Sequence, residues 1–331
     1  MKAKPKIMGA NGLDFEKSII EFEKKIAELK ELASSFRTDL SPEIRALEKQ
    51  LLKEKKLAYS KLTPWQKVLI SNEPQRPRSS DYINTLFENR VELFGDRIFG
   101  DDPAIIGGLA RFRGYDIVFL GQEKGRDTKE RLARNFGYMH PEGYRKALRL
   151  MKLAEKFNKP VVIFIDIPAA APGVEAEVRG QPIAIGENLA EMSALRTPII
   201  SIVIGQGGSG GALGVGVTDV ILMLENSIYC VCPPETCSQI LWRDNEHASE
   251  AAAALRLTAT DLLELGIIDD IIKEPLGGAH RDPKLTISRV GRALKKNLDT
   301  LTATDIDESL EKRYQKYRNM GQFVLSDVEA I

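Results

Sequence analysis

Two runs in the middle of the chain are almost entirely apolar, and they constrain the fold more than any other feature. They are Val161–Ile165 and Ile199–Ile204. A strand that is apolar on both faces must be covered on both faces, which is typical of parallel strands packed between helices. Amphipathic segments suited to helices lie beside these runs, at 141–157 and 181–195. The sequence therefore predicts an α/β core with parallel strands.

More short strands are expected around this core. Residues 104–112 and 116–120 are rich in β-forming side chains, and a turn sequence centred on Gly114 separates them, so they predict a β-hairpin. A further buried strand is expected at 220–224. The tail after Asp282 again has a helical pattern.

The first 95 residues have helical patterns. Apolar residues recur in steps of four and three along the first helix: Phe15, Ile19, Phe22, Ile26 and Leu29. This spacing places them on one face. A second helix is expected with Ser41 as its N-cap and Pro42 at its first position. Because the polar stretch 34–38 joins the two, they are predicted to form an antiparallel hairpin.

Two further helices are expected before the core. Thr63 and Gln66 have the spacing of a capping box, with Pro64 in the first turn. Ser80 or Asp81 is expected to cap a fourth helix that runs to Gly95.

These patterns divide the chain into three parts. Residues 1–95 are predicted to form a helical N-terminal arm for packing or assembly. Residues 96–282 are predicted to form the α/β core, and residues 283–331 a C-terminal helical segment.

The charge balance bears on the possible partners. Lys+Arg and Asp+Glu both number 47, so the formal net charge is zero, which argues against nucleic acid as the main ligand. No apolar run of about 18 residues occurs, so no membrane span is predicted. The N-terminal segment lacks the apolar stretch of a secretory signal. A cytoplasmic location is expected.

No metal site is predicted. The chain has three cysteines and three histidines: Cys230, Cys232, Cys237, His140, His247 and His280. A tetrahedral zinc site needs four ligands at suitable spacing, which these residues do not provide. The thiols are expected to be reduced and packed in or beside the core.

The strongest local signal for chemistry is the glycine-rich turn Gly205–Gly211, between a buried strand and a helix. Glycines let the backbone take positive φ and let a ligand approach it closely. The first N–H groups of a helix have no partner within the helix and lie at the positive end of its dipole. Such a turn can hold an anion, or an oxyanion that forms only during a reaction.

Two other interpretations of this turn are open. Gly205, Gly207 and Gly210 match the spacing of a dinucleotide-binding fingerprint, and Glu225 follows the next strand. That pattern is weak by itself. A purely structural glycine turn is the stronger alternative.

Two loops could line a site near this turn. Residues 167–181 follow the strand that ends at Asp166, and ligands of α/β folds bind beyond the carboxyl ends of strands. Asp166 could equally be a caged structural carboxylate. In the second loop, 121–128, Lys124 and Arg126 suit a phosphate or carboxylate, with a solvated loop and local ion pairs as the alternative.

Several ordered segments resemble one family, the α subunit of the acetyl-CoA carboxylase carboxyltransferase of the bacterial multi-subunit type. They are the runs 121–128, 135–137, 141–150, 207–213, 240–242 and 274–281, with the Leu-Thr-Pro-Trp run at 62–65. The likeness extends over nearly the whole chain, including the helical arm.

The resemblance implies a crotonase (ClpP/crotonase-like) fold: a spiral of ββα units with an N-terminal helical arm and C-terminal helices. It implies an α2β2 assembly with a homologous β subunit that supplies the acetyl-CoA site and a zinc ribbon. It also implies carboxybiotin, delivered by the biotin carboxyl carrier protein, and a biotin carboxylase. The product would be malonyl-CoA, for fatty-acid synthesis.

The resemblance also implies roles for residues. The backbone N–H groups of Gly207 and Gly208 match the positions that form the oxyanion hole for the biotin ureido oxygen. A carboxybiotin pocket is expected from five neighbours: Ala170, Ala171, Gly173, Ser209 and Gly210. Lys124 and Arg126 are expected on the anion or CoA side.

This chain departs from the family pattern in three places. At 167–171 it lacks a hydroxyl, a glycine and an aromatic ring, so Ala169 is costly if that position needs positive φ. Pro233 and Thr236 replace Ser and Gly, and Gln206 stands where Glu is common. These changes favour one alternative function, a catalytically impaired scaffold subunit.

Overall fold

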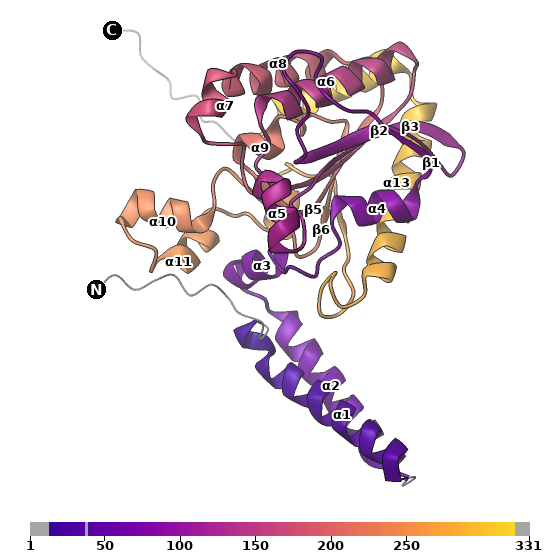
Figure 1. Cartoon of the computed structure of the whole chain (residues 1–331), viewed down its shortest axis with the longest axis vertical. Helices are drawn as coiled ribbons and strands as arrows, with labels where there is room; N and C mark the ends of the chain where they lie inside the picture. Colours follow the sequence, from indigo (N-terminus) through magenta and orange to yellow (C-terminus); the bar gives the residue numbers. More distant parts are fainter. Residues whose placement is uncertain (1–12, 37–38, 322–331) are drawn as a thin grey trace, which may run out of the picture.

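The computed structural model describes residues 13–36 and 39–321. Within them an eight-stranded sheet carries helices on both faces, and a long helical hairpin extends away from it (Figure 1). The strand order is β1-β2-β3-β4-β5-β6-β8, and β7 pairs with β5 beyond the end of β6. Strands β1 to β3 are antiparallel, and all later pairings are parallel.

The strands are short, as the sequence indicated. They are β1 (Glu88–Glu92), β2 (Ile105–Phe112), β3 (Tyr115–Gln122), β4 (Val161–Ile167), β5 (Ile199–Gly208), β6 (Val220–Leu224), β7 (Ile228–Cys230) and β8 (Asp270–Ile272). The predicted hairpin is β2 and β3, and the predicted buried strands are β4, β5 and β6. These predictions are confirmed.

The helices lie before, between and after the strands. The first are η1 (Asp14–Glu16), α1 (Lys17–Phe36), α2 (Ser41–Ser60), α3 (Pro64–Ser71), α4 (Ser79–Leu86), α5 (Thr128–Ala133), η2 (Asn135–Gly137) and α6 (Pro141–Lys156). The others are α7 (Val174–Val178), α8 (Gln181–Ala194), α9 (Ser209–Leu213), α10 (Pro234–Trp242), α11 (Ala248–Ala254), α12 (Ala259–Glu264), α13 (Pro283–Ala303) and α14 (Ile306–Arg318). No described helix combines the length and apolarity needed to cross a bilayer.

The two faces of the sheet bury separate apolar clusters. Ile163 and Ile165 of β4 pack in one cluster with side chains of α6 and α8. Val162 and Phe164, which point the other way, pack in the second with side chains of α4 and α13. This two-sided burial explains why the central strands are apolar at nearly every position.

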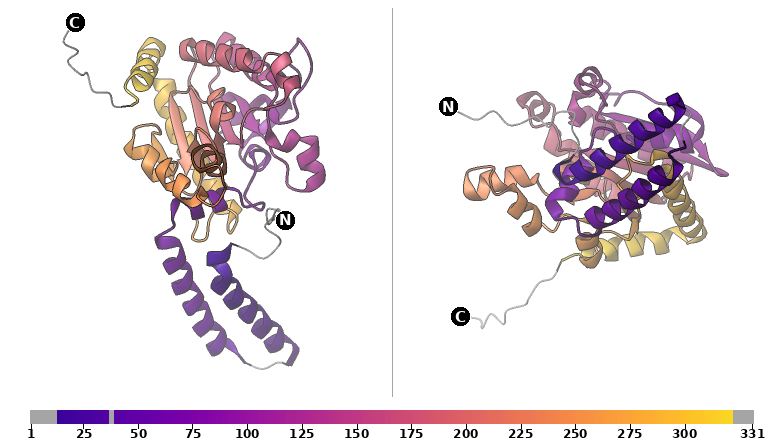
Figure 2. Two further views of the ribbon diagram at one scale, coloured as in Figure 1. Left: turned by 90° about the vertical axis from the view of Figure 1, so that its left-hand side faces the viewer. Right: turned by 90° about the horizontal axis from the view of Figure 1, so that it is seen from below.

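The N-terminal arm is the predicted antiparallel hairpin of α1 and α2, and it extends away from the core in Figure 1 and in the left view of Figure 2. Its apolar stripe is confirmed, because Ile19 and Ile26 are buried. The base of the arm is tied to the core by Arg281, whose guanidinium binds Glu16 at 3.2 Å and Glu23 at 3.0 Å. One detail was wrong: Ser41 is the first residue of α2 and makes no cap.

The predicted fourth helix is present, but its cap is Arg78 rather than Ser80 or Asp81, and its extension to Gly95 is wrong. Helix α4 ends at Leu86, and β1 pairs antiparallel with β2. The open edge of β2 supplies hydrogen-bond partners that local helical periodicity cannot reveal. The sheet therefore takes in residues before position 96, and the three-part division of the chain stays a prediction.

The tail is helical as expected through α13 and α14, and residues 322–331 lie outside the described part. Helix α14 is anchored by Arg313, which is buried and binds Asp219 through Nε at 2.8 Å and Nη2 at 2.9 Å. Its other donors meet the carbonyls of Met192, Leu195 and Thr197. This arrangement satisfies a buried cation and fastens the tail to the core.

A second buried ion pair joins the segment before α4 to the segment after β8. Arg76 and Glu274 form two hydrogen bonds, at 2.7 and 3.0 Å, with side-chain exposures of 1% and 0%. Burial disfavours the Glu274 carboxylate, but Arg76 outweighs that cost and holds the pKa of Glu274 below its usual range. Glu274 also accepts the N–H groups of Asn226 and Ala279.

Removing one partner of this pair should leave an uncompensated buried charge. We expect Arg76→Met to lower the free energy of unfolding by about 3–5 kcal/mol. The matched control is Arg196→Met, because Arg196 pairs with Asp307 on the surface, at exposures of 51% and 73%. Urea unfolding should show a large loss for the first variant and almost none for the second. Equal midpoints would contradict the role given to Arg76.

Candidate active site

The carboxyl ends of β4 and β5 meet at an irregularity in the sheet. Ile165 pairs with Val203 and Ile167 pairs with Gly207. Between these pairs β4 has one residue and β5 has three, so β5 carries a bulge. A bulge takes backbone groups out of the ladder, and buried backbone groups need other partners.

Two charged side chains supply those partners. Asp166, the single β4 residue opposite the bulge, accepts the N–H of Gln206 through Oδ1 at 2.9 Å. Arg76 donates through Nη2 to the carbonyl of Ile204 at 2.9 Å. The bulge is therefore held on both sides by buried ionic groups.

Asp166 is a buried carboxylate enclosed by cations, which agrees with the structural role that the sequence left open for it. Its Oδ2 binds Arg78 at 3.0 Å and its Oδ1 binds the ammonium of Lys124 at 2.6 Å. Lys124 also donates to Oε1 of Gln206 at 2.6 Å. Burial disfavours the Asp166 carboxylate, but Lys124 and Arg78 outweigh it and hold the pKa of Asp166 below its usual range. Burial also lowers the pKa of Lys124, to about 8, although Asp166 opposes this shift.

Part of the predicted turn Gly205–Gly211 is strand. Strand β5 continues to Gly208, and α9 begins at Ser209. The expected positive φ occurs within this run only at Ser209, where φ is 49°. The glycines are thus not needed for left-handed backbone, and that part of the prediction is wrong.

The glycines are needed because neighbouring atoms leave no room for a side chain. A Cβ on Gly205 would lie 2.4 Å from Oδ1 of Asp166. A Cβ on Gly208 would lie 1.8 Å from the carbonyl oxygen of Pro168, which belongs to the backbone and cannot turn aside. Close packing of β4 against β5 therefore selects glycine here.

The short helix α9 is held in place by side chains from other segments. Gln122 donates through Nε2 to the carbonyl of Gly211 at 2.9 Å, and the hydroxyl of Tyr144 reaches the same oxygen at 3.3 Å. Asn188 donates to the carbonyl of Gly214 at 2.8 Å. Gln122 and Tyr144 lie in two of the resemblance segments, which thus serve to position the glycine run.

A small cavity of about 20 Å³ lies beside Gly207 and Gly208. It has room for about one water molecule. Its other lining residues are Val68, Pro168, Gln206, Ile228, Cys230, Pro233, Pro234 and Glu235. The sequence marked Pro233 as a departure from the family pattern but did not place it here, so the start of α10 with its N-cap Pro233 is a newly found part of the site.

The five expected pocket residues do not line this cavity. Gly173 is the N-cap of α7, and Ser209 and Gly210 begin α9. Ala170 pairs with Met139 in an isolated bridge. Their role in holding a biotin ring stays a prediction.

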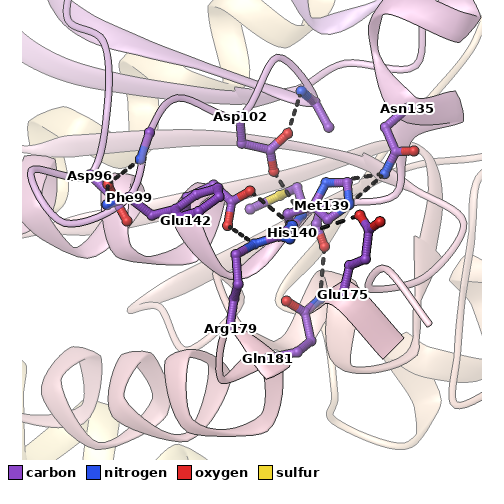
Figure 3. Close-up of polar contacts among 12 residues, drawn as sticks. Asp96, Phe99, Asp102, Asn135, Met139, His140, Glu142, Glu175, Arg179 and Gln181 are labelled. Atoms are coloured by element: carbon purple, nitrogen blue, oxygen red, sulfur yellow. Dashed lines mark hydrogen bonds and ion pairs between the residues drawn. The ribbon is translucent and has the colours of Figure 1, made fainter. Parts of the chain in front are cut away.

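Met139 and His140 are held by polar contacts with neighbouring residues, among them Gln181 and Asp102 (Figure 3), and Met139 also supports the loop that contains Ala171. The carbonyl of Met139 accepts the N–H of Ala171 at 2.9 Å and Nε2 of Gln181 at 2.7 Å. The adjacent N–H of His140 is bound by Asp102 at 2.8 Å. Burial raises the pKa of Asp102 to about 6, against the backbone N–H groups that favour its anion.

The changed residues of this loop cause no backbone strain. Ala169 does not have positive φ, so alanine in place of glycine is accommodated there. A Cβ on Gly211 would lie 2.6 Å from the carbonyl carbon of Ala169, which shows how closely the loop packs on α9.

The structure separates Lys124 from Arg126. Lys124 is buried and engaged by Asp166 and Gln206. Arg126 is about half exposed and pairs with Asp81. The local ion pair expected as the alternative is present at Arg126, and the role of the two cations on the anion or CoA side stays a prediction.

Sequence reasoning overlooked the arginines beneath the site. Arg78 meets a partner 88 residues away, and Arg76 meets one 198 residues away. No local pattern marks such contacts. The sequence marked only the partner of Arg76, because Glu274 is the first residue of the resemblance segment 274–281.

The three cysteines are free thiols. Burial raises the pKa of Cys230 to about 12. Within the described ranges 13–36 and 39–321, no group of three or more potential ligands could hold a metal ion.

Solved structures resemble this arrangement. Transcarboxylase 12S with methylmalonyl-coenzyme A bound matches with a TM-score of 0.57 and 16% identity over 70% of this chain and 42% of that chain, so this chain spans less than half of it. A Pseudomonas malonate decarboxylase hetero-tetramer in complex with coenzyme A matches with a TM-score of 0.54 and 19% identity, over 65% of this chain and 86% of that chain. The fold is therefore of the crotonase-like class, as predicted.

Sequence relatives identify the family within that class. The chain matches the family described as acetyl co-enzyme A carboxylase carboxyltransferase-like over residues 12–321. It is 50% identical to the acetyl-coenzyme A carboxylase carboxyl transferase subunit alpha of Thermus thermophilus, over 94% of this chain and 98% of that protein. It is 51% identical to that of Bacillus subtilis, over 95% and 97%. The chain belongs to the family of acetyl-CoA carboxylase carboxyltransferase α subunits.

The dinucleotide alternative does not match the geometry. A dinucleotide fingerprint needs a tight turn between a strand and a helix that receives the pyrophosphate. Here Gly205 and Gly207 lie within β5, and α9 is a single short turn of five residues.

The steric role of Gly208 can be tested by adding one methyl group. We expect Gly208→Ala to lower the free energy of unfolding by about 1–3 kcal/mol, because the new Cβ must displace the Pro168 carbonyl. Gly186→Ala is the control: Gly186 lies in α8 with no neighbouring atom within 4 Å of an added Cβ. That change should instead raise stability by about 0.5–1 kcal/mol. Equal effects in urea unfolding would refute the close-packing explanation.

Proposed function

We propose that this chain, together with a carboxyltransferase β subunit, transfers a carboxyl group from carboxybiotin to acetyl-CoA. The carboxybiotin is delivered on the biotin carboxyl carrier protein, and the product is malonyl-CoA for fatty-acid synthesis. Family membership supports the reaction, and one observation supports the site. Gly207 and Gly208 end a strand whose bulge is fixed by buried charges, and they line the cavity with backbone rather than side chain.

The proposed chemistry needs backbone donors and no side-chain base. As the bond between the biotin nitrogen and the carboxyl carbon breaks, negative charge develops on the ureido oxygen. N–H groups of Gly207 and Gly208 that face this oxygen stabilise that charge. The α-proton of acetyl-CoA passes to the biotin nitrogen, and the enolate forms a carbon–carbon bond to the released CO2. Electrostatic stabilisation and proximity then supply the rate enhancement.

Exposed apolar side chains support an assembly. Val174 and Val178 on α7 are 77% and 81% exposed, and Ile240 and Leu241 on α10 are 70% and 62% exposed. Figure 1 shows α10 and α11 standing out from the core at the left of the view. Large exposed apolar residues near a site mark surfaces for protein partners. The proposed partners are the β subunit in an α2β2 complex, the carrier protein and biotin carboxylase, and the proposed location is the cytoplasm.

The impaired-scaffold alternative loses part of its support. One reason for it was strain at Ala169, and the backbone there is unstrained, whereas the loss of a hydroxyl and an aromatic ring from the 166–173 loop is unaffected by this finding. The alternative remains an outcome of the activity test below.

Activity should require the β subunit and Gly208. We expect the chain, purified with a β subunit, to catalyse malonyl-CoA-dependent carboxylation of biocytin. Gly208→Ala should lower kcat about 100-fold or more, because it displaces an oxyanion donor. Gly186→Ala should leave the rate unchanged. A stable complex of the wild-type chain that transfers no carboxyl group would support the scaffold instead.

A further inference from the structure

The positions of the proposed oxyanion donors, the N–H groups of Gly207 and Gly208, depend on the bulge at residues 204–206 directly before them. Gly207 follows Gln206 directly, so the orientation of the Gln206 peptide decides where the next N–H groups point. Gln206 is held by two hydrogen bonds: its N–H donates to Asp166, and its side-chain oxygen accepts from Lys124. The side chains of Asp166 and Lys124 are both almost fully buried.

We propose that Lys124 is a positioning residue for the reaction, acting through Asp166 and Gln206 to hold the Gly207–Gly208 donors in place. Its ammonium joins Oδ1 of Asp166 and Oε1 of Gln206, each at 2.6 Å. It thereby locks a β4 carboxylate and a β5 amide into one hydrogen-bonded unit. This inference rests on the proposed function, because it concerns the same site.

Two glycines leave the space that the position of Lys124 requires. The stem of Lys124 is covered by η2, where a Cβ on Gly137 would lie 2.6 Å from its Cγ. Gly125, the next residue, has φ of 75°, and a Cβ there would meet the backbone of Glu130 at 2.6 Å. Two glycines are therefore required for the lysine to reach Asp166.

Positive charges outnumber negative charges around Lys124. The groups that face it are the carboxylate of Asp166 on β4, the guanidinium of Arg78 before α4, the guanidinium of Arg131 on α5 and the neutral amide of Gln206 on β5. The buried trio of Arg78, Lys124 and Asp166 has two cations and one anion. Burial disfavours the ammonium, the single carboxylate of Asp166 does not offset that cost, and Arg78 adds to it, so the pKa of Lys124 is lowered to about 8.

The hydrogen bonds from Lys124 to Asp166 and Gln206 should therefore weaken in mildly alkaline solution. The protonated ammonium has three donors and serves both oxygens, whereas the neutral amine is a much weaker donor. As pH rises through about 8, Lys124 loses its proton and the Gln206 peptide loses one restraint. The rate of carboxyl transfer should fall over the same range.

Two variants of the chain, each in complex with the β subunit, test this. Lys124→Met should lower kcat about 10- to 100-fold through misplaced donors, leave KM for acetyl-CoA unchanged and abolish the alkaline decline. Gln206→Glu gives the ammonium a second carboxylate, so the alkaline limb of kcat should move up by about one pH unit or more. Lys129→Met, exposed on α5, is the control and should match the wild-type rate and profile.

The outcomes are separable. If the wild-type complex transfers no carboxyl group, the proposed function has failed. If it is active and Lys124→Met keeps the wild-type kcat and pH profile, the positioning role is overturned. Should Lys124→Met not fold, Gln206→Glu decides alone: an alkaline limb that stays in place overturns the inference, and an upward shift supports it.

Discussion

The carboxylate of Asp166 is the contact on which the rest of the site depends. It fills the gap where β4 has one residue and β5 has three, and it binds the N–H of Gln206 that the bulge removes from the ladder. An unpaired carboxylate could not remain there, because burial would force its protonation. Arg78 and Lys124 keep it charged. Gly205 follows from the same contact, since any side chain there would collide with Asp166.

The buried charges also explain how distant parts of the chain form one site. The segment before α4 brings Arg76 and Arg78 under the end of β5, and Glu274 binds Arg76 from beyond β8. Burying ion pairs contributes little net stability, and apolar residues of similar size would often serve as well. Such pairs can instead fix orientation, because each of these hydrogen bonds forms in one geometry only. A strand end that must present backbone donors accurately benefits from that constraint.

The sequence predicted the features that are encoded locally. The apolar runs at β4 and β5 gave the parallel core, and the stripe through Ile19 and Ile26 gave the arm. The helix expected up to Gly95 failed because the edge of β2, a distant segment, recruits β1. The glycine run was located correctly, but the positive φ expected for it was wrong: the gap too narrow for a Cβ depends on Pro168 and Asp166, some 40 residues away. The sequence showed Lys124 as a cation suited to a phosphate or carboxylate, and it could not show the partners Asp166 and Gln206, because they lie on β4 and β5.

Two parts of the cavity lining are built differently, and this bears on how the proposed enzyme would work. The β5 wall is fixed by buried ionic contacts inside the chain. Another part of the lining, Pro233–Glu235, is the N-cap and first turn of α10, whose Ile240 and Leu241 are largely exposed. Burial of those side chains against a partner would stabilise α10 and set the position of Pro233–Glu235. The cavity of the isolated chain has room for one water, so a biotin ring needs that part of the lining to be placed farther out. On the proposed assembly, the donors are thus preorganised within this chain, and the width of the pocket depends on the complex.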